Sequence, residues 1–410
     1  MTSLSESVPQ QPAVPSARPF LIGCGFFLLL MLYLGIFAPR SATNGFDFRS
    51  FYTSGVMVRT QPHALYDLTA QKQVQDALVS RENLPLPFAH PSYEALFYAP
   101  FSLASYRTDY LLFLITNVFL LALVFFLSRP LFDGVIPALQ PRPGLMFFLF
   151  IPVIIAIWQG QDSILFLLLF CCAWRQVQRG RDFSAGVFLA LCLFRFQLAI
   201  PLAIFFAVRR GRSFVAGFVV AGAAVAALCF AILGRDGVVS MFELMRSFSL
   251  SNDHGTLAQQ AMAVHPLAMP NLYGLVHALG GSHLSSRVSF GMTIGLSIAL
   301  FLWSLDRARR AGDDATAFGI AILCSVLVSQ HLYMHDASLL LPAFALLHGR
   351  VHNAILVVCY VLPAVLFLLA GSPWFFLLAV PVLFMLYDAC TARFRKLQLP
   401  AKTVRSGLAH

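Results

Sequence analysis

Residues 19–38 read PFLIGCGFFLLLMLYLGIFA, and residues 45–52, a short way beyond, read GFDFRSFY. The first stretch contains no charged side chain and has the length of one helical membrane crossing. Asp47 follows it by about nine residues, so we expect this carboxylate at the membrane surface. A carboxylate held there suits an enzyme acting on lipid-linked substrates, because it can accept a proton from a hydroxyl while the lipid tail stays in the bilayer.

The composition of the whole chain indicates a helical membrane protein. Of 410 residues, 59% are hydrophobic and 11% are charged, and the mean hydropathy is +0.76. Soluble proteins are about 25% charged. Long apolar runs rich in phenylalanine argue against a transmembrane β-barrel, whose strands alternate in polarity. The net charge of +10 comes from short basic clusters between apolar runs, as the positive-inside rule predicts, so we expect no nucleic-acid partner.

The apolar runs predict an all-α polytopic protein with about ten full transmembrane helices. These lie at about 19–38, 108–128, 144–158, 163–174, 214–233, 288–304, 316–332, 337–348, 354–370 and 374–390. Arginine clusters near residues 175–181, 209–212, 307–310 and 393–396 predict the cytoplasmic side.

This topology divides the chain into a membrane domain, two outer loops and two tails. Residues 19–390 form the transmembrane domain, and the loops 39–107 and 234–287 face away from the cytoplasm. We expect residues 1–18 to be a disordered cytoplasmic tail and residues 391–410 a basic cytoplasmic tail. In the first loop, the helix predicted for 47–60 could lie flat on the interface, and a second helix begins after Asp67 as N-cap.

The apolar segment from 183 to 208 has arginine clusters on both flanks and Arg195, Gln197 and Pro201 at its middle. A single crossing would put one cluster outside. A re-entrant hairpin keeps both clusters in the cytoplasm and explains the polar middle, because irregular backbone at depth is tolerated where it is buried in protein or lines a wet cavity. We favour the hairpin, with the single span as the alternative.

Five stretches in order resemble glycosyltransferase family 87, bacterial membrane mannosyltransferases of the GT-C superfamily. They are DFRSFYTSGVMVRTQPHALYD (47–67), FAHPSYEALFYAPFSLASY (88–106), GQDSILFLLL (160–169), FRFQLAIPLAIFFAVRR (194–210) and SQHLYMHDASLLLPA (329–343). The chain departs from the family at Ser92, where proline is usual, and at Arg195, where lysine is usual.

The resemblance implies a GT-C-type fold and an inverting enzyme of the cell (inner) membrane. Its donor would be a polyprenyl-phosphate sugar, usually mannose, and its acceptor a lipid-linked or polymeric glycan at the extracytoplasmic face. Membrane lipids would be partners, and no cofactor is expected. A secondary transporter or lipid-sugar flippase is the alternative, but only one broken segment is found where such proteins have paired broken helices.

The resemblance also implies Asp47 as general base; its alternative is a helix N-cap. Arg195 is a candidate for the donor phosphate, because a guanidinium binds phosphate with two parallel hydrogen bonds. Its alternative is a buried ion pair with Asp162 or Asp336.

The remaining candidates are weaker. Gln197, His331 and His335 are assigned to the donor phosphate. The two histidines would share a helical face that is formally compatible with metal, yet no third ligand follows, so we expect no metal. Substrate-binding candidates are Tyr52, Tyr66, His90, Gln161, Asp162 and Asp336. Interfacial anchoring for the aromatic residues and turn formation for Gln161 and Asp162 are the alternatives.

Overall fold

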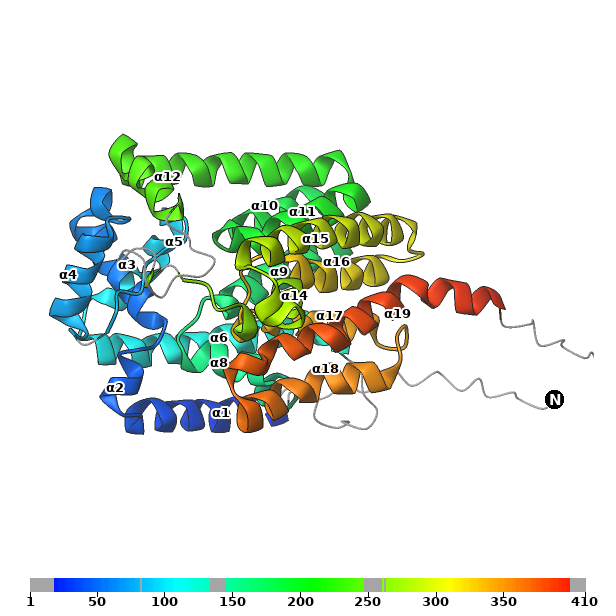
Figure 1. The fold of residues 1–410 in the computed structure, drawn as a ribbon, viewed down its shortest axis with the longest axis horizontal. Helices are drawn as coiled ribbons and strands as arrows, with labels where there is room; N and C mark the ends of the chain where they lie inside the picture. The colour runs from blue at the N-terminus through cyan, green and yellow to red at the C-terminus, as the bar shows by residue number, and fades with distance from the viewer. Residues whose placement is uncertain (1–17, 82, 133–144, 247–259, 262, 399–410) are drawn as a thin grey trace, which may run out of the picture.

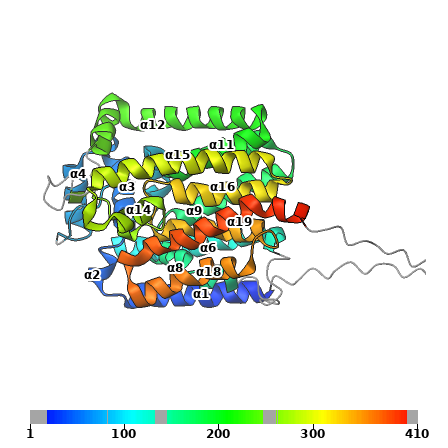
Figure 2. The same cartoon turned by 45° about the vertical axis from the view of Figure 1, so that its right-hand side comes forward.

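The computed structural model describes residues 18–81, 83–132, 145–246, 260–261 and 263–398, and this part of the chain folds into helices without strands. Long helices lie roughly side by side, from α12 along one side of the bundle to α1 and α18 along the other (Figures 1 and 2). Shorter helices, including α3 and α4, gather at one end of the bundle (Figure 1). The all-α prediction is confirmed.

The first half of the chain forms α1 (Arg18–Phe37), α2 (Arg40–Thr43), α3 (Phe48–Thr60), α4 (Leu68–Leu78), α5 (Ser92–Tyr98), α6 (Tyr106–Phe132), α7 (Leu145–Leu149), α8 (Ile151–Trp158), α9 (Ser163–Gln178), α10 (Asp182–Ala190) and α11 (Phe196–Arg210). The second half forms α12 (Arg212–Arg246), α14 (Leu272–Gly280), α15 (Ser286–Arg310), α16 (Asp314–Val328), α17 (Leu340–Leu347), α18 (Asn353–Val365) and α19 (Ala379–Gln398). Short 3-10 segments η4 (Leu191–Arg195), η7 (Met334–Leu339) and η9 (Ser372–Leu378) and the π-helical turn η8 (Leu366–Ala370) join several of them.

Six helical stretches within the described residues are long and apolar enough to cross a membrane, so the chain is a polytopic membrane protein. They are Tyr106–Ser128, Asp182–Arg210, Arg212–Arg246, Ser286–Arg310, Asn353–Ala370 and Ser372–Thr391. Four shorter apolar helices accompany them: Leu21–Phe37, Ser163–Gln178, Asp314–Val328 and Met334–Leu347. The predicted count of about ten therefore depends on helices of fewer than 18 residues.

Two of the predicted spans have different bounds in the structure. The run at 144–158 is divided into α7 and α8 at Phe150, whose extended backbone precedes Pro152. Proline is tolerated in the first turn of a helix but not in its interior, because it has no N–H to donate to the carbonyl four residues back, so a new helix begins just before Pro152. At the other end of the chain, α19 continues to Gln398, so part of the tail predicted at 391–410 is helical. Residues 1–17 and 399–410 lie outside the described residues.

The segment Asp182–Arg210 is bent in the middle, where η4 separates α10 from α11. Its two ends meet, because Nε of Arg210 donates to Oδ1 of Asp182 at 2.8 Å. The start of α12 then packs closely on α10: a Cβ placed on Gly217 would lie 2.0 Å from the carbonyl oxygen of Phe183. Glycine is therefore required where these two helix backbones touch.

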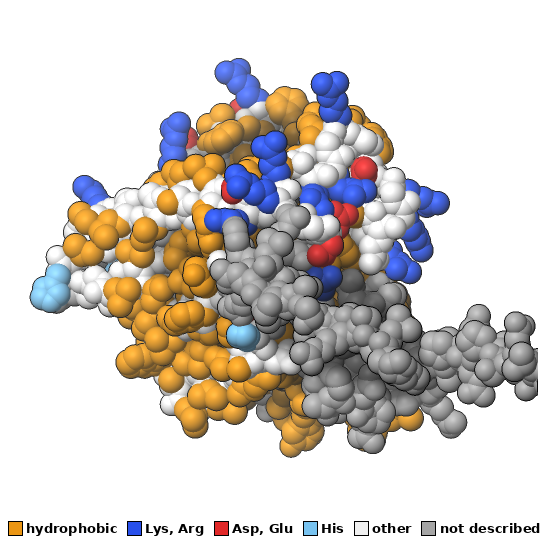
Figure 3. All heavy atoms as spheres, turned by 90° about the vertical axis from the view of Figure 1, so that its right-hand side faces the viewer, with side chains coloured by type: hydrophobic (Ala, Val, Ile, Leu, Met, Phe, Trp, Pro, Cys, Tyr) orange, Lys and Arg blue, Asp and Glu red, His pale blue; other side chains and the backbone are white. Residues whose placement is uncertain are grey.

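Several basic clusters predicted for the cytoplasmic side meet at one end of the bundle. Arg209 and Arg210 both pair with Asp314 at the start of α16, at 2.7 and 2.9 Å. Nη1 of Arg209 also donates to the carbonyl of Ala311, which follows the cluster at 307–310. Figure 3 shows arginine and lysine side chains gathered on this end of the molecule.

The first predicted outer loop folds into α3, α4 and α5. Asp67 caps α4, accepting from the backbone nitrogens of Thr69 and Ala70 at 2.8 and 3.2 Å, which confirms the predicted cap. Helix α3 is packed inside the protein along most of its length, so the structure differs from the interfacial helix expected there. In the second predicted loop, α12 turns at Gly234 (φ 64°) and continues to Arg246; residues 247–259 and 262 lie outside the described part.

Candidate active site

A cavity of about 910 Å³ lies where the short helices meet the bundle. Its polar wall comes from seven separate parts of the chain: the start of α3, the segment 83–90, the turn between α8 and α9, η4, the region of Gln260 and His265, the segment 331–335, and the start of η9. The polar and charged residues that line it are Asp47, Arg49, Ser50, Asn83, His90, Gln159, Gln161, Arg195, Gln260, His265, His331, Tyr333, His335 and Ser372.

Asp47 is half-buried at the start of α3 and lines this cavity. It occupies the N-cap position, but its side chain makes no capping hydrogen bond. Its Oδ2 instead accepts a hydrogen bond from Nε2 of Gln161, whereas Oδ1 has no hydrogen-bond partner in the described part of the chain. The side chain is therefore directed to the cavity wall by Gln161, and one oxygen remains available to a ligand.

Arg195 is buried at the end of η4, and each of its three nitrogens is bonded to another part of the protein. Nε lies 2.9 and 3.0 Å from the two oxygens of Asp162, Nη1 lies 3.1 Å from Asp336, and Nη2 donates to Oε1 of Gln161 at 2.8 Å. This geometry matches the alternative that the sequence allowed for Arg195, a buried ion pair with Asp162 or Asp336. It also connects Arg195 to Asp47 through one glutamine side chain.

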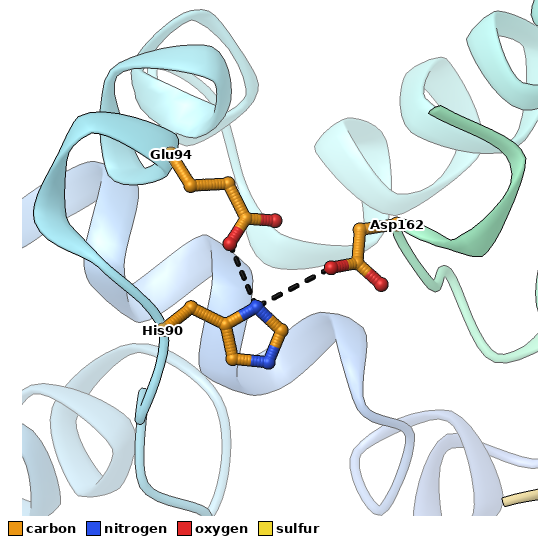
Figure 4. A group of neighbouring side chains, drawn as sticks. All are labelled: His90, Glu94 and Asp162. Atoms are coloured by element: carbon orange, nitrogen blue, oxygen red, sulfur yellow. Dashed lines mark hydrogen bonds and ion pairs between the residues drawn. The ribbon is translucent and has the colours of Figure 1, made fainter. Parts of the chain in front are cut away.

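A second cluster adjoins this network at the start of α5. Nδ1 of His90 lies 2.7 Å from Oε2 of Glu94 and 3.3 Å from Oδ2 of Asp162, so it points between the two carboxylates (Figure 4). Burial lowers the pKa of His90, but the two carboxylates outweigh this and raise it to about 9. Burial raises the pKa of Glu94 to about 7, against the opposing effect of His90. His90 therefore carries a proton at neutral pH.

The same three side chains could also hold a metal ion, since their ligand atoms lie within 4.8 Å of one another. Histidine nitrogen and carboxylate oxygen suit zinc and several other divalent ions. Both oxygens of Asp162 already face Nε of Arg195, however, so a cation here would lie against a guanidinium. The residues fit a shared proton better than a metal, and the absence of a metal stays a prediction.

The histidines near residue 331 line the cavity, but they do not share a helical face. The residues from 329 to 333 are non-helical, and η7 begins only at Met334. The prediction that His331 and His335 share one helical face was therefore wrong, because the backbone at His331 is not helical. His335 is buried, with Nε2 3.5 Å from Asp336, and Nε2 of Gln197 donates to the carbonyl of His331 at 3.4 Å.

The sequence profile of glycosyltransferase family 87 matches residues 88–334, more than half of the chain. The chain belongs to glycosyltransferase family 87. No match was found among curated proteins. The protein is thus a membrane glycosyltransferase, which uses a sugar donor and an acceptor.

The family 87 match includes the charged network but begins after the first helices of the chain. His90, Glu94, Asp162 and Arg195 all lie within the matched residues, whereas Asp47 lies before them. The carboxylate is joined to the matched region by its hydrogen bond to Gln161. A catalytic role for Asp47 in this family 87 enzyme therefore depends on that contact and on the cavity, and it remains a proposal.

Two aromatic candidates are packed away from the cavity of the enzyme. Tyr52 is buried and donates to the carbonyl of Ala104 at 3.0 Å, and Tyr66 is buried and donates to the carbonyl of His90 at 2.5 Å. Neither residue lines the cavity. Their contacts give them a packing role, and the hydroxyl of Tyr66 holds the backbone at His90 in place.

Two buried charged residues of the site were not singled out in the sequence. Glu94 is the one charged residue of α5 and lies at the i+4 position from His90, and this spacing was the available signal. Arg49 lies two residues after Asp47, is 4% exposed and lines the cavity. A basic residue next to a loop has no distinguishing sequence signal, so only the structure identifies it.

Proposed function

We propose that this family 87 glycosyltransferase transfers a hexose, mannose in the first instance, from a polyprenyl phosphate to a lipid-linked or polymeric glycan acceptor. The transfer takes place at the extracytoplasmic face of the inner membrane and inverts the anomeric configuration. The observation that carries the proposal is the position of Asp47, which lines the cavity and is oriented by Gln161 with one carboxylate oxygen unbonded among the described residues.

In the proposed step, Oδ1 of Asp47 accepts the proton of an acceptor hydroxyl. The hydroxyl oxygen attacks the anomeric carbon of the donor as the bond from that carbon to the phosphate oxygen breaks. The electron pair of the broken bond remains on the polyprenyl phosphate, and the acceptor carries the sugar. A positioned general base of this kind contributes roughly 10²–10⁴ in rate.

The network behind Asp47 keeps this base in one orientation. Gln161 donates to the carboxylate and accepts from Arg195, so the direction of its amide is fixed. Arg195 is fixed in turn by Asp162 and Asp336. We therefore assign Arg195 as a positioning residue, since its nitrogens are bonded to the protein, and not as the ligand of the donor phosphate.

In the topology that we propose, α10 and α11 enter the membrane from the cytoplasm and return as a re-entrant hairpin. The ion pair between Asp182 and Arg210 joins the two ends of the segment. The polar turn at Arg195 then lies at depth against the cavity, where irregular backbone is tolerated. The cavity and α3 lie toward the opposite, extracytoplasmic end.

The test uses purified protein in detergent or nanodiscs, radiolabelled polyprenyl-phosphate mannose, and lipids extracted from the producing cells. We expect a labelled product that has lost the phosphate and whose rate of formation falls by roughly 10²–10⁴ in Asp47→Asn. If other polyprenyl-phosphate hexoses are used and mannose is not, the donor sugar is revised. If no lipid-phosphate donor yields product under conditions where soluble nucleotide sugars do, the donor class is wrong.

A further inference from the structure

Arg49 is the second residue of α3 and lies in the wall of the same cavity as Asp47. Its side chain is 4% exposed. Nη2 donates to the carbonyl of Leu84 at 2.8 Å, but Nε and Nη1 are buried and have no hydrogen-bond partner in the part of the chain that the structure describes. The residue therefore holds a buried charge with two unused donors.

This state is energetically unfavourable for the protein alone. A buried charge requires a partner, and buried donors left unbonded cost free energy. Burial accordingly lowers the pKa of Arg49, although Tyr106, Asp47 and Asp76 act in the opposite direction. The contrast with Arg195 is direct, because there every nitrogen is bonded within the protein. Among the described residues, Arg49 is the one of these two arginines that has no carboxylate in contact with its guanidinium.

The chemistry of the Arg49 side chain indicates which ligand could supply the missing negative charge. A guanidinium can bind a phosphate group through two parallel hydrogen bonds, which the ammonium group of a lysine cannot form. Asp47 does not fill this role, because its Oδ2 accepts from Gln161 and it forms no hydrogen bond or ion pair with Arg49 in the described part of the chain. The cavity wall thus contains a base and, two residues further along the chain, a cation that contacts no carboxylate among the described residues.

We propose that Arg49 binds the phosphate of the donor and stabilises the charge that develops on it as the sugar departs. This inference rests on the proposed function and deepens it by naming the residue that recognises the leaving group. Since Nε and Nη1 are buried, the phosphate reaches them only after a shift in the cavity wall. Residues 83–87, which include Asn83 and Leu84, line the cavity beside Arg49 without helical structure and are the part expected to move.

The test compares the affinity of the protein for a polyprenyl phosphate with its affinity for the polyprenol of the same chain length. The ratio isolates the contribution of the phosphate group. We expect wild type to prefer the phosphate and Arg49→Gln to lose about tenfold or more of this preference, with polyprenol affinity unchanged. Arg59→Gln is the matched control: Arg59 belongs to the same helix, bonds to Ser102 and does not line the cavity, so it should keep the wild-type ratio.

A second measurement separates binding from folding. Arg49→Met removes the buried charge and its two unbonded donors at the loss of one hydrogen bond, to the carbonyl of Leu84, so the ligand-free protein should unfold near the wild-type temperature. Polyprenyl phosphate should raise the unfolding temperature of wild type and of Arg59→Gln, but raise that of Arg49→Met much less. A structural role for Arg49 predicts the reverse: a less stable ligand-free variant with an undiminished ligand effect.

The outcomes distinguish the two proposals. If wild type prefers the phosphate and the Arg49 variants do so equally, Arg49 is not the phosphate ligand and the proposed donor stands. If wild type does not distinguish polyprenyl phosphate from polyprenol, the donor class is overturned and the role of Arg49 with it. An Arg49→Lys protein should retain part of the preference, because its charge survives while the planar fork is lost.

Discussion

Arg210 donates from Nε to Oδ1 of Asp182 across 2.8 Å, although the two residues lie at opposite ends of an apolar stretch of 29 residues. A straight helix of that length would separate them by about 42 Å. The reversal takes place at η4, which ends at Arg195. A stretch with the hydropathy of a single membrane span is therefore folded back on itself in this protein.

This geometry predicts that both ends of the segment are reached from the same side of the membrane. In a background without the native cysteines, Ser184→Cys and Arg212→Cys should react with a membrane-impermeant thiol reagent from the cytoplasmic side only. Arg81→Cys, exposed in the region between α4 and α5, should react from the opposite side. Labelling of positions 184 and 212 from different sides would show that the segment crosses the membrane.

For Asp47→Asn we expect turnover to fall by roughly 10²–10⁴, the usual contribution of a positioned acid–base group, with donor affinity little changed. Folding should survive, because Asp47 makes no capping hydrogen bond that the substitution would remove. Asp47→Glu should also be poor, since an added methylene displaces the base. Initial rates and the unfolding temperature are measured on the same preparations. A folded Asp47→Asn protein with near-normal turnover would remove this residue from the mechanism.

Replacement of Arg195 tests whether it is a structural and positioning residue. Arg195→Leu leaves Asp162 and Asp336 buried without their cation, so we expect a loss of about 3–5 kcal/mol in unfolding free energy. Arg350→Leu is the control, since its pair with Asp313 is largely exposed and should contribute about 1 kcal/mol or less. Thermal or denaturant unfolding in detergent provides the comparison. Normal stability with weakened donor binding would favour the phosphate role instead.

The raised pKa of His90 predicts a stability that declines toward alkaline pH. The folded state holds its proton up to about pH 9, whereas the unfolded chain releases it near 6.5. The stabilisation is thus complete below about pH 6.5 and is lost as pH rises to about 9. We expect the difference in unfolding temperature between wild type and His90→Gln to shrink over this interval. A difference that stays constant from pH 6 to 9.5 would contradict the protonated state.

The contact between α10 and α12 predicts a strong effect of one added methyl group. Gly217→Ala would bring a Cβ to 2.0 Å from the carbonyl oxygen of Phe183, which forces the helices apart and should cost about 1–3 kcal/mol. Gly222→Ala on the same helix is the matched control, because its Cβ would meet only a side-chain atom of Leu193 at 3.7 Å. That control should be neutral or slightly stabilising. Equal stability of the two variants would show that α10 and α12 are not packed this tightly.

The sequence by itself determined the features that depend on neighbouring residues. Apolar runs gave the helical membrane class, because the length of a hydrophobic segment is a local property. The cap at Asp67 was also predictable, since a capping side chain reaches only two or three residues ahead. Paired basic flanks indicated the reversal around Arg195, and the order of five motifs indicated the family.

Only the tertiary structure decided which charges pair. Arg195 could have met a lipid phosphate or a carboxylate, and the choice depends on Asp162 and Asp336, which come from distant parts of the chain. In the same way, Tyr52 has a side chain of the kind that packs on sugar rings, but here it is buried and bonded to the carbonyl of Ala104. Arg49 had no sequence signal, yet it lines the cavity with two donors that are unbonded within the described part of the chain. Hydrogen bonds and ion pairs at low dielectric form between whichever groups the fold brings together, and a linear sequence does not contain those distances.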